Sequence, residues 1–152
     1  MKEENRIEDK ILEIEKYLEE LIPNLPAELE EYKKDFKIKA ICERYFEKIV
    51  EAMVDLAFIT IKDKKLTIPE DDKQAFDILS SNKIISQELS EKLKDTKGMR
   101  NVIVHEYGRI DDDKIFYSIT EELEKDTKEF INNITNLIEK GKRNKKSKNA
   151  KL

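Results

Sequence analysis

Apolar residues recur at spacings of three and four along most of the chain, which is the pattern of amphipathic helices. The first stretch predicts a helix over residues 3–22, with one apolar stripe formed by Ile7, Ile11, Ile14, Leu18 and Leu21. Asn24, Leu25 and Pro26 interrupt this stripe. Pro26 can open the following helix, because the first helical turn does not need the N–H that proline lacks.

A second apolar pattern keeps helical spacing from about residue 29 to Thr60 and contains no glycine or proline. It predicts one long helix. Such a helix needs packing along its whole length, so we expect it to form the spine of a bundle, with surplus apolar surface for a subunit interface. Asp35 lies within this stretch among basic neighbours, and we expect it to be an ordinary surface residue.

A short third helix is predicted over residues 71–81, after a polar connection at residues 61–70. Its first turn is acidic, which the positive end of the helix dipole favours. Asn82 is its expected stop. Ser86 is placed to cap a fourth helix over residues 87–106, because a serine oxygen can accept a hydrogen bond from a free N–H of the first turn.

Gly108 is expected to end the fourth helix, and Asp111–Asp113 to form an acidic loop. Ser118 and Glu121 have the spacing of a capping box, which predicts the start of a last amphipathic helix. The apolar residues of this helix are Leu123, Phe130, Ile131, Ile134, Leu137 and Ile138.

The composition favours the same architecture. Only three glycines and three prolines occur in 152 residues, while lysine, glutamate, leucine and isoleucine are abundant, which is typical of helical proteins. The length is sufficient for one domain with its own core. We therefore expect an all-α, up-and-down bundle of about five helices over residues 1–139, followed by a basic, flexible tail at residues 140–152.

Charge is divided unevenly between these two parts. Seven of the 30 basic residues lie in residues 140–152, which contain no acidic residue, and the other 23 face 34 acidic residues in residues 1–139. An acidic body is a poor general binder of nucleic acid. If RNA is a partner, contact has to be confined to a local basic cleft or assisted by the tail. The competing interpretation of the tail is a solvated extension.

Several classes of site are disfavoured by the residue counts. The single cysteine, Cys42, excludes an internal disulfide, and the single histidine, His105, excludes a two-histidine metal centre within one chain. Asp111–Asp113 lacks the alternating spacing of a calcium loop. No apolar run is long enough to span a bilayer and the N-terminus is charged. We expect a cytoplasmic protein without a metal or cofactor, in which Cys42 is a core residue.

The candidate chemistry lies on the predicted fourth helix, in the run from Gly98 to Tyr107. At about 100° per residue, Arg100 and His105 fall on opposite margins of an apolar strip formed by Met99, Val102 and Ile103. Asn101 falls near His105, and Tyr107 falls near Arg100. A twofold axis brings the same patch of two subunits together, so the strip can unite Arg100 of one chain with His105 of the other. Gly98 can allow another backbone to approach.

An arginine and a histidine suit phosphodiester cleavage in RNA, where the 2′-hydroxyl can attack its own phosphate. The histidine can move the proton, and the arginine can hold the phosphate and stabilise charge in the transition state. The alternative is structural, because both residues also complement the negative end of a helix dipole.

The run Arg100-Asn101-Val102-Ile103-Val104-His105-Glu106-Tyr107 resembles the R-x4-H-x-Y signature of HepT-like toxins in the HEPN superfamily. Arg100, Asn101 and His105 match the catalytic motif of the superfamily, and Tyr107 matches the tyrosine of the HepT branch. The resemblance covers roughly residues 5–138 and includes Arg6-Ile7, Lys10-Ile11, the segment Ala40-Ile41-Cys42-Glu43-Arg44-Tyr45, Pro69 and Ile84-Ile85-Ser86.

The resemblance implies a HEPN bundle that forms a homodimer or higher oligomer with a composite active site. It implies a metal-independent endoribonuclease that cleaves tRNA or mRNA as the toxin of a type VII toxin–antitoxin pair. The antitoxin would be an MntA-type minimal nucleotidyltransferase that attaches AMP to Tyr107. Phosphates added there would compete with RNA for Arg100.

Arg44 matches a Glu-Arg pair of the family and is a candidate for a second cation in the cleft. The alternative is a structural ion-pair region at Glu43 and Arg44. The rival function for the whole chain is a non-catalytic helical module that binds a nucleotidyltransferase or presents substrate to it. The two functions differ in one observable, since only the toxin cleaves RNA.

Overall fold

The computed structural model describes residues 3–105 and 111–150, with side chains described for residues 5–105 and 111–146. These residues form an all-α bundle, as the sequence predicts. Its elements are α1 (Glu3–Leu21), a 3-10 turn (Ile22–Asn24), α2 (Leu29–Lys34), α3 (Phe36–Asp63), α4 (Asp72–Ser81), α5 (Gln87–His105), α6 (Asp112–Tyr117), a π turn (Ser118–Glu122) and α7 (Leu123–Ala150).

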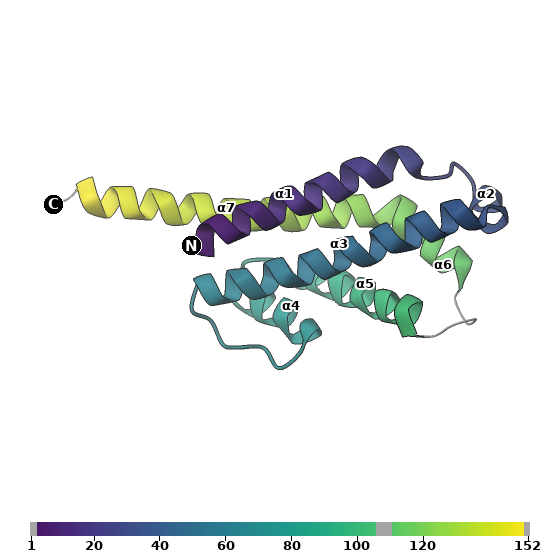
Figure 1. Ribbon diagram of the computed structural model, residues 1–152. Coiled ribbons are helices and arrows are strands. Elements are labelled where there is room, and N and C mark those ends of the chain that lie inside the picture. Colours follow the sequence, from purple (N-terminus) through teal and green to yellow (C-terminus); the bar gives the residue numbers. More distant parts are fainter. Residues whose placement is uncertain (1–2, 106–110, 151–152) are drawn as a thin grey trace.

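Helix α3 is the spine of the bundle. In Figure 1, α1 and α7 lie on one side of it and α4 and α5 on the other. The expected apolar stripe of α1 is buried against α3. The large apolar side chains of α3, including Phe46, Met53 and Leu56, are also buried. Phe76 of α4 meets Phe130 of α7 edge to face, with ring centroids 5.9 Å apart. The core is therefore continuous from α1 to α7.

The long second helix is interrupted at Asp35, contrary to expectation. The backbone of Asp35 is extended, and its side chain accepts hydrogen bonds from the N–H groups of Lys37 at 3.0 Å and Ile38 at 3.2 Å. These are N–H groups that the first turn of a helix leaves without internal partners. Asp35 is thus the N-cap of α3. Its expected exposure at the surface is confirmed, and its expected place inside a helix was wrong.

The predicted caps Asn82 and Ser86 of the middle helices are confirmed. Asn82 is the C-cap of α4. The N-cap of α4 is Asp71, whose side chain accepts from the N–H of Gln74 at 2.8 Å. The Oγ of Ser86 accepts from the N–H of Leu89 at 3.0 Å. Helix α5, which carries the candidate site, therefore starts at a fixed point, and this sets the direction in which each of its side chains points.

The last helical region starts earlier than expected. Asp111 caps α6 by accepting from the N–H of Lys114 at 3.3 Å, so Asp112 and Asp113 form a helical first turn rather than a loop. Negative charge is favoured there. Ser118 is buried in helical conformation, and its backbone N–H donates to the carbonyl oxygens of Lys114 and Ile115 at the end of α6. The capping box at Ser118 was therefore a wrong prediction, and α6 continues through the π turn into α7.

Helix α7 also runs further than expected. It does not end near residue 140 but continues to Ala150, so most of the expected tail is helical. Lysine and arginine are good helix formers and no proline stops the helix. In Figure 1 this part of α7 extends beyond the N-terminal end of α1. In the part of the chain that the structure describes, no helix is long and apolar enough to cross a bilayer.

Candidate active site

Helix α5 packs antiparallel to α3 (Figure 1). Arg100 of α5 faces α3, where it meets Glu51. Leu89, Leu93 and Ile103 anchor the inner face of α5 in the core. Arg100 lies on that face, and its side chain is only 18% exposed. Its Nη2 atom lies 3.9 Å from Oε2 of Glu51 on α3, whose side chain is 60% exposed. The guanidinium is therefore held in a half-buried position by a long and largely solvated ion pair.

Lys97 lies one turn before Arg100 on the same face, and the sequence interpretation missed it. The residue is only 8% exposed. Its Nζ atom donates to Oδ1 of Asn101 at 3.0 Å and lies 3.1 Å from Oδ2 of Asp72 on α4. The spacing of four residues between Lys97 and Asn101 is the signal that could have indicated this contact.

Asn101 is held by two cations. Arg100 Nη1 lies 3.5 Å from Oδ1 of Asn101, the same atom that accepts from Lys97. Lysine and arginine side chains only donate hydrogen bonds, so the amide must turn its oxygen toward them. This orientation leaves the Nδ2 amino group of Asn101 as the group that can donate to a ligand.

A cavity of about 360 Å³ adjoins these side chains. Its lining residues are Glu51, Val54, Asp55, Phe58, Asp72, Lys97 and Arg100. Among the described residues, Nε of Arg100 is buried without a hydrogen-bond partner. The cavity thus combines two cations with an unused donor, although three carboxylates also line it. An anion that binds here has to displace Glu51 from Arg100.

His105 is the last described residue of α5 and is exposed. It follows Arg100 by five residues, which is a rotation of about 140° around the helix axis. Arg100 faces α3, and His105 therefore points away from it. The two residues do not converge within one chain, as the helical angles predict. Tyr107 lies outside the described residues.

Arg44 is exposed on α3 and pairs with Glu47, with 3.2 Å between Nη1 and Oε1. Glu47 and Glu51 follow it on the same face. Because α5 runs antiparallel to α3, Arg44 and His105 both lie toward the same end of the bundle from the Arg100–Glu51 pair. Arg44 lies about 10 Å from Glu51 along α3, and His105 lies about 7 Å from Arg100 along α5. A role for Arg44 in the cleft stays a prediction.

Glu43 is partly buried, and Arg44 pairs with Glu47 instead of with Glu43. Among the described residues, its Oε1 atom is buried without a hydrogen-bond partner. Burial raises the pKa of Glu43, and the Lys39 amine opposes this rise. Cys42 is fully buried, and burial raises the pKa of its thiol to about 11. Its expected role as a core residue is confirmed, because a buried thiol with a raised pKa is a poor nucleophile.

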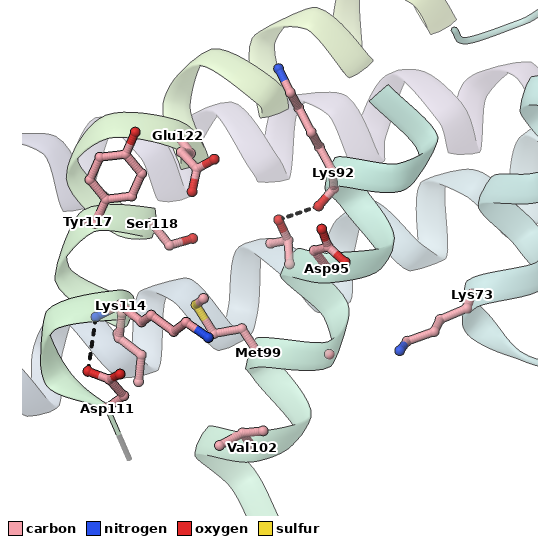
Figure 2. A pocket seen from close by; sticks show the side chains of 13 residues that line it. Lys73, Lys92, Asp95, Met99, Val102, Asp111, Lys114, Tyr117, Ser118 and Glu122 are labelled. Atoms are coloured by element: carbon pink, nitrogen blue, oxygen red, sulfur yellow. Dashed lines mark hydrogen bonds between the residues drawn. The ribbon is translucent and has the colours of Figure 1, made fainter. Parts of the chain in front are cut away.

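A larger cleft of about 720 Å³ lies along another face of α5, against α6 and the π turn. In Figure 2, Met99 and Val102 line it, and Lys114 extends toward Met99. Ile103 is instead buried in the core. The predicted apolar strip is therefore divided, with one residue in the core and two in the cleft. A Cβ atom on Gly98 would lie 3.5 Å from Nζ of Lys73, which is an ordinary contact.

The chain matches a known protein family over most of its length. Residues 7–134 match the family model described as ribonuclease HepT-like. The chain belongs to the HepT-like family. The matched range spans Arg100, Asn101, His105 and Tyr107, and the predicted membership of the family is confirmed.

Named relatives of this HepT-like chain are nucleases. It is 31% identical over 101 residues to the mRNA nuclease HepT of Shewanella oneidensis, covering 66% of this chain and 75% of the relative. It is 29% identical over 114 residues to the tRNA nuclease HepT of Aphanizomenon flos-aquae, covering 75% of this chain and 78% of the relative.

The HepT-like fold is also found in a solved complex. A tri-AMPylated HEPN toxin of Shewanella oneidensis, bound to its MNT antitoxin, superposes with a TM-score of 0.78 at 28% identity. The superposition covers 85% of this chain and 96% of that toxin. The HEPN bundle predicted for this chain is thereby confirmed. Residues 135–152 lie outside the family match.

Proposed function

We propose that the protein is a metal-independent endoribonuclease and the toxin of a HEPN/MNT toxin–antitoxin pair. The observation that carries the proposal is the half-buried Arg100, held beside a cavity on the helix that ends at His105. Membership of the HepT-like family and similarity to nucleases acting on mRNA and tRNA support RNA as the substrate. We propose a cytoplasmic location for the same reason, because mRNA and tRNA occur there.

The reaction needs only groups that the chain and the RNA supply. The 2′-oxygen of the RNA forms a bond to the adjacent phosphorus, and the bond from phosphorus to the 5′-oxygen of the next nucleotide breaks. His105 takes the proton of the 2′-hydroxyl or gives a proton to the leaving oxygen. Arg100 moves from Glu51 onto the phosphate and stabilises its added charge, and Nδ2 of Asn101 donates to it.

A complete site in this proposal contains residues of two chains. The reaction uses one general base and one general acid, and each chain has one histidine. Arg100 and His105 point about 140° apart on α5, so a single chain does not align them on one phosphate. A twofold dimer supplies the second histidine and a second Arg100. The cleavage rate per subunit should therefore fall when the protein is diluted below its dimerisation constant.

Regulation is proposed to act at Tyr107. The similar toxin of Shewanella oneidensis is AMPylated and bound to an MNT antitoxin. We assign the same partner class to this chain, a minimal nucleotidyltransferase that transfers AMP from ATP. Tyr107 follows His105 by two residues, and phosphates attached there add negative charge close to the site and compete with RNA for Arg100.

Two experiments test these roles. Wild-type protein expressed without the antitoxin should arrest growth and cleave RNA, while His105→Ala should fold and dimerise but do neither. A wild type without nuclease activity would instead support the non-catalytic module. For regulation, intact mass after incubation with ATP and the nucleotidyltransferase should rise in steps of AMP. Tyr107→Phe should abolish this rise, and the exposed Tyr117→Phe should serve as the matched control.

A further inference from the structure

The C-terminal turns of α7 carry a dense positive charge. Between residues 140 and 146 the described cations are all exposed, and no acidic residue lies among them. They are Lys140, Lys142, Arg143, Lys145 and Lys146. Successive residues rotate by about 100° around a helix, so these cations surround the axis of α7 instead of forming one stripe. Like charges three and four residues apart repel one another, and a bound polyanion would relieve this repulsion.

The fold adds further lysines from a distant part of the sequence. Lys62, Lys64 and Lys65 lie at the C-terminal end of α3. A Cβ atom on Gly141 of α7 would lie only 3.3 Å from Nζ of Lys64, so the missing side chain of Gly141 makes room for this lysine. We call these three lysines and the five cations of α7 the basic end surface.

Carboxylates offset only part of this charge. Lys142 lies 3.5 Å from Oε1 of Glu8, and Lys64 lies 3.6 Å from Oδ2 of Asp63. The net charge of the rest of the molecule has the opposite sign, because residues 1–139 contain 11 more acidic than basic residues. An anionic polymer approaching the protein is therefore repelled by most of the body and attracted to this end.

We propose that the basic end surface binds the sugar–phosphate backbone of the RNA substrate, away from the cleavage site. The inference rests on the proposed ribonuclease function. In Figure 1 the C-terminal end of α7 and the C-terminal end of α5 lie at opposite ends of the bundle. Lys64 is 13 residues from Glu51, the partner of Arg100, which corresponds to about 20 Å along α3. A stacked strand rises about 3.4 Å per nucleotide, so this span requires about six nucleotides.

The chemistry of the surface favours RNA over a protein or a membrane. A protein interface has a core of apolar and aromatic side chains, and a membrane-bound helix needs an apolar face. Residues 139–146 are Glu-Lys-Gly-Lys-Arg-Asn-Lys-Lys and contain neither. Flexible lysines around a helix instead suit phosphates that follow one another along a chain. The segment also lies outside the family match at residues 7–134.

The test compares two charge variants of the full-length protein. The first changes Lys64, Lys142, Arg143 and Lys145 to glutamine. The matched control changes four exposed lysines elsewhere, Lys16, Lys34, Lys125 and Lys128, to glutamine and thus loses the same charge. Each protein is assayed on an RNA of about four nucleotides, too short to span the two places, and on one of about 24 nucleotides, which spans them.

The basic-end variant should lose roughly tenfold or more in kcat/KM on the long RNA and remain close to wild type on the short one. Its RNA affinity should depend less steeply on salt, with a log–log slope that falls by about 0.7 for each phosphate that the variant no longer neutralises. The control variant should resemble wild type on both RNAs. Circular dichroism verifies that each variant is folded.

Equal losses in both variants, or none in the first, would overturn the assignment. So would a basic-end variant that binds RNA normally but no longer binds the nucleotidyltransferase. RNA binding is also measured by fluorescence anisotropy with the His105→Ala protein. That readout tests the surface even if the wild type cleaves no RNA, an outcome that would refute the ribonuclease function itself.

Discussion

Replacing Lys97 with methionine tests whether the cation behind Asn101 is part of the active site. Methionine keeps most of the apolar length of lysine and removes the ammonium group. Lys97 is only 8% exposed and its Nζ atom donates to Oδ1 of Asn101 at 3.0 Å. Without this donor, Oδ1 retains only Arg100, at 3.5 Å. The amide can then rotate, and Nδ2 loses the orientation in which it donates to the phosphate.

The expected size of the effect follows from the hydrogen bond that the substitution removes. A hydrogen bond to a charged group contributes about 1.5–3 kcal/mol, which corresponds to a decrease of roughly 10- to 100-fold in kcat if the whole contribution is expressed in the transition state. Stability should change little. Asp72, the other partner of Lys97, is 44% exposed and can be hydrated, and methionine suits a buried position. Activity and stability should therefore separate.

The assay is cleavage of a short fluorogenic RNA, with kcat and KM determined separately, alongside urea unfolding. Lys97→Arg keeps the charge and should recover part of kcat. Lys94→Met is the matched control, because Lys94 lies on the same helix and pairs with Asp77 at 2.8 Å and Glu91 at 3.0 Å, away from the cavity. A Lys97→Met protein with kcat within about twofold of wild type, or with activity lost only in proportion to stability, would refute the reasoning.

Three further predictions concern the scaffold. Asp35→Ala removes the N-cap of α3 and should destabilise the protein by about 1 kcal/mol, lowering Tm by about 2–4 °C, while Asp35→Ser should not; equal Tm values for the two variants would contradict the capping role. Because burial raises the pKa of Cys42 to about 11, its thiol should react with a disulfide reagent at pH 8 only after denaturation, and rapid reaction of the native protein would contradict its burial. Burial also raises the pKa of Asp126, with Lys92 opposing. A carboxyl group whose pKa is raised on folding contributes stability below its ordinary pKa and loses it as the pH rises through the raised value. Asp126→Asn should therefore raise Tm at pH 7, with the gain shrinking as the pH falls toward the ordinary value of 3.8; a gain that is independent of pH would contradict this assignment.

The bounds of α1 and α4 and the start of α5 follow from local signals, while the expected end of α5 at Gly108 lies outside the described residues. In each case an apolar stripe ends at or near a residue that can cap or break a helix, such as Ser86 or Asn82, and no distant contact changes the outcome. The break at Asp35 was missed because hydrophobic spacing continues across it. The two hydrogen bonds to its side chain compete with helical continuation, and spacing alone does not reveal which of the two prevails.

The error at Ser118 has a different cause. Ser118 and Glu121 match a capping box, but Asp111 offers an earlier cap, and Ile115 anchors the helix between them in the core. Tertiary packing places Ser118 and Ile119 in the interior. A residue at the interior of a helical segment cannot also serve as its cap. A motif of two residues is thus weak evidence when a second cap lies one or two turns upstream.

For the active site, the sequence is sufficient to predict the angles between side chains around α5. It is not sufficient to predict which neighbouring helix each side chain faces. Spacing alone predicts that Arg100 and His105 diverge. It does not tell which of them faces α3, because this depends on which side of α5 is buried. The partners of Arg100 and Lys97 are Glu51 on α3 and Asp72 on α4. Both contacts join segments that are far apart in sequence, so only the fold could reveal them.

The cations at Arg100 and those of the basic end surface matter because residues 1–139 contain more acidic than basic residues. Each phosphate is attracted strongly only where cations are concentrated, and carboxylates elsewhere repel it. In the described part of the molecule, the basic end surface contains eight cations, and Lys97 lies beside Arg100 at a cavity that three carboxylates also line. An RNA that reaches both gains two sets of contacts, whereas a shorter one must bind against the carboxylates that line the cavity. Selection of RNA by length and shape can therefore arise from electrostatics, without contacts to particular bases.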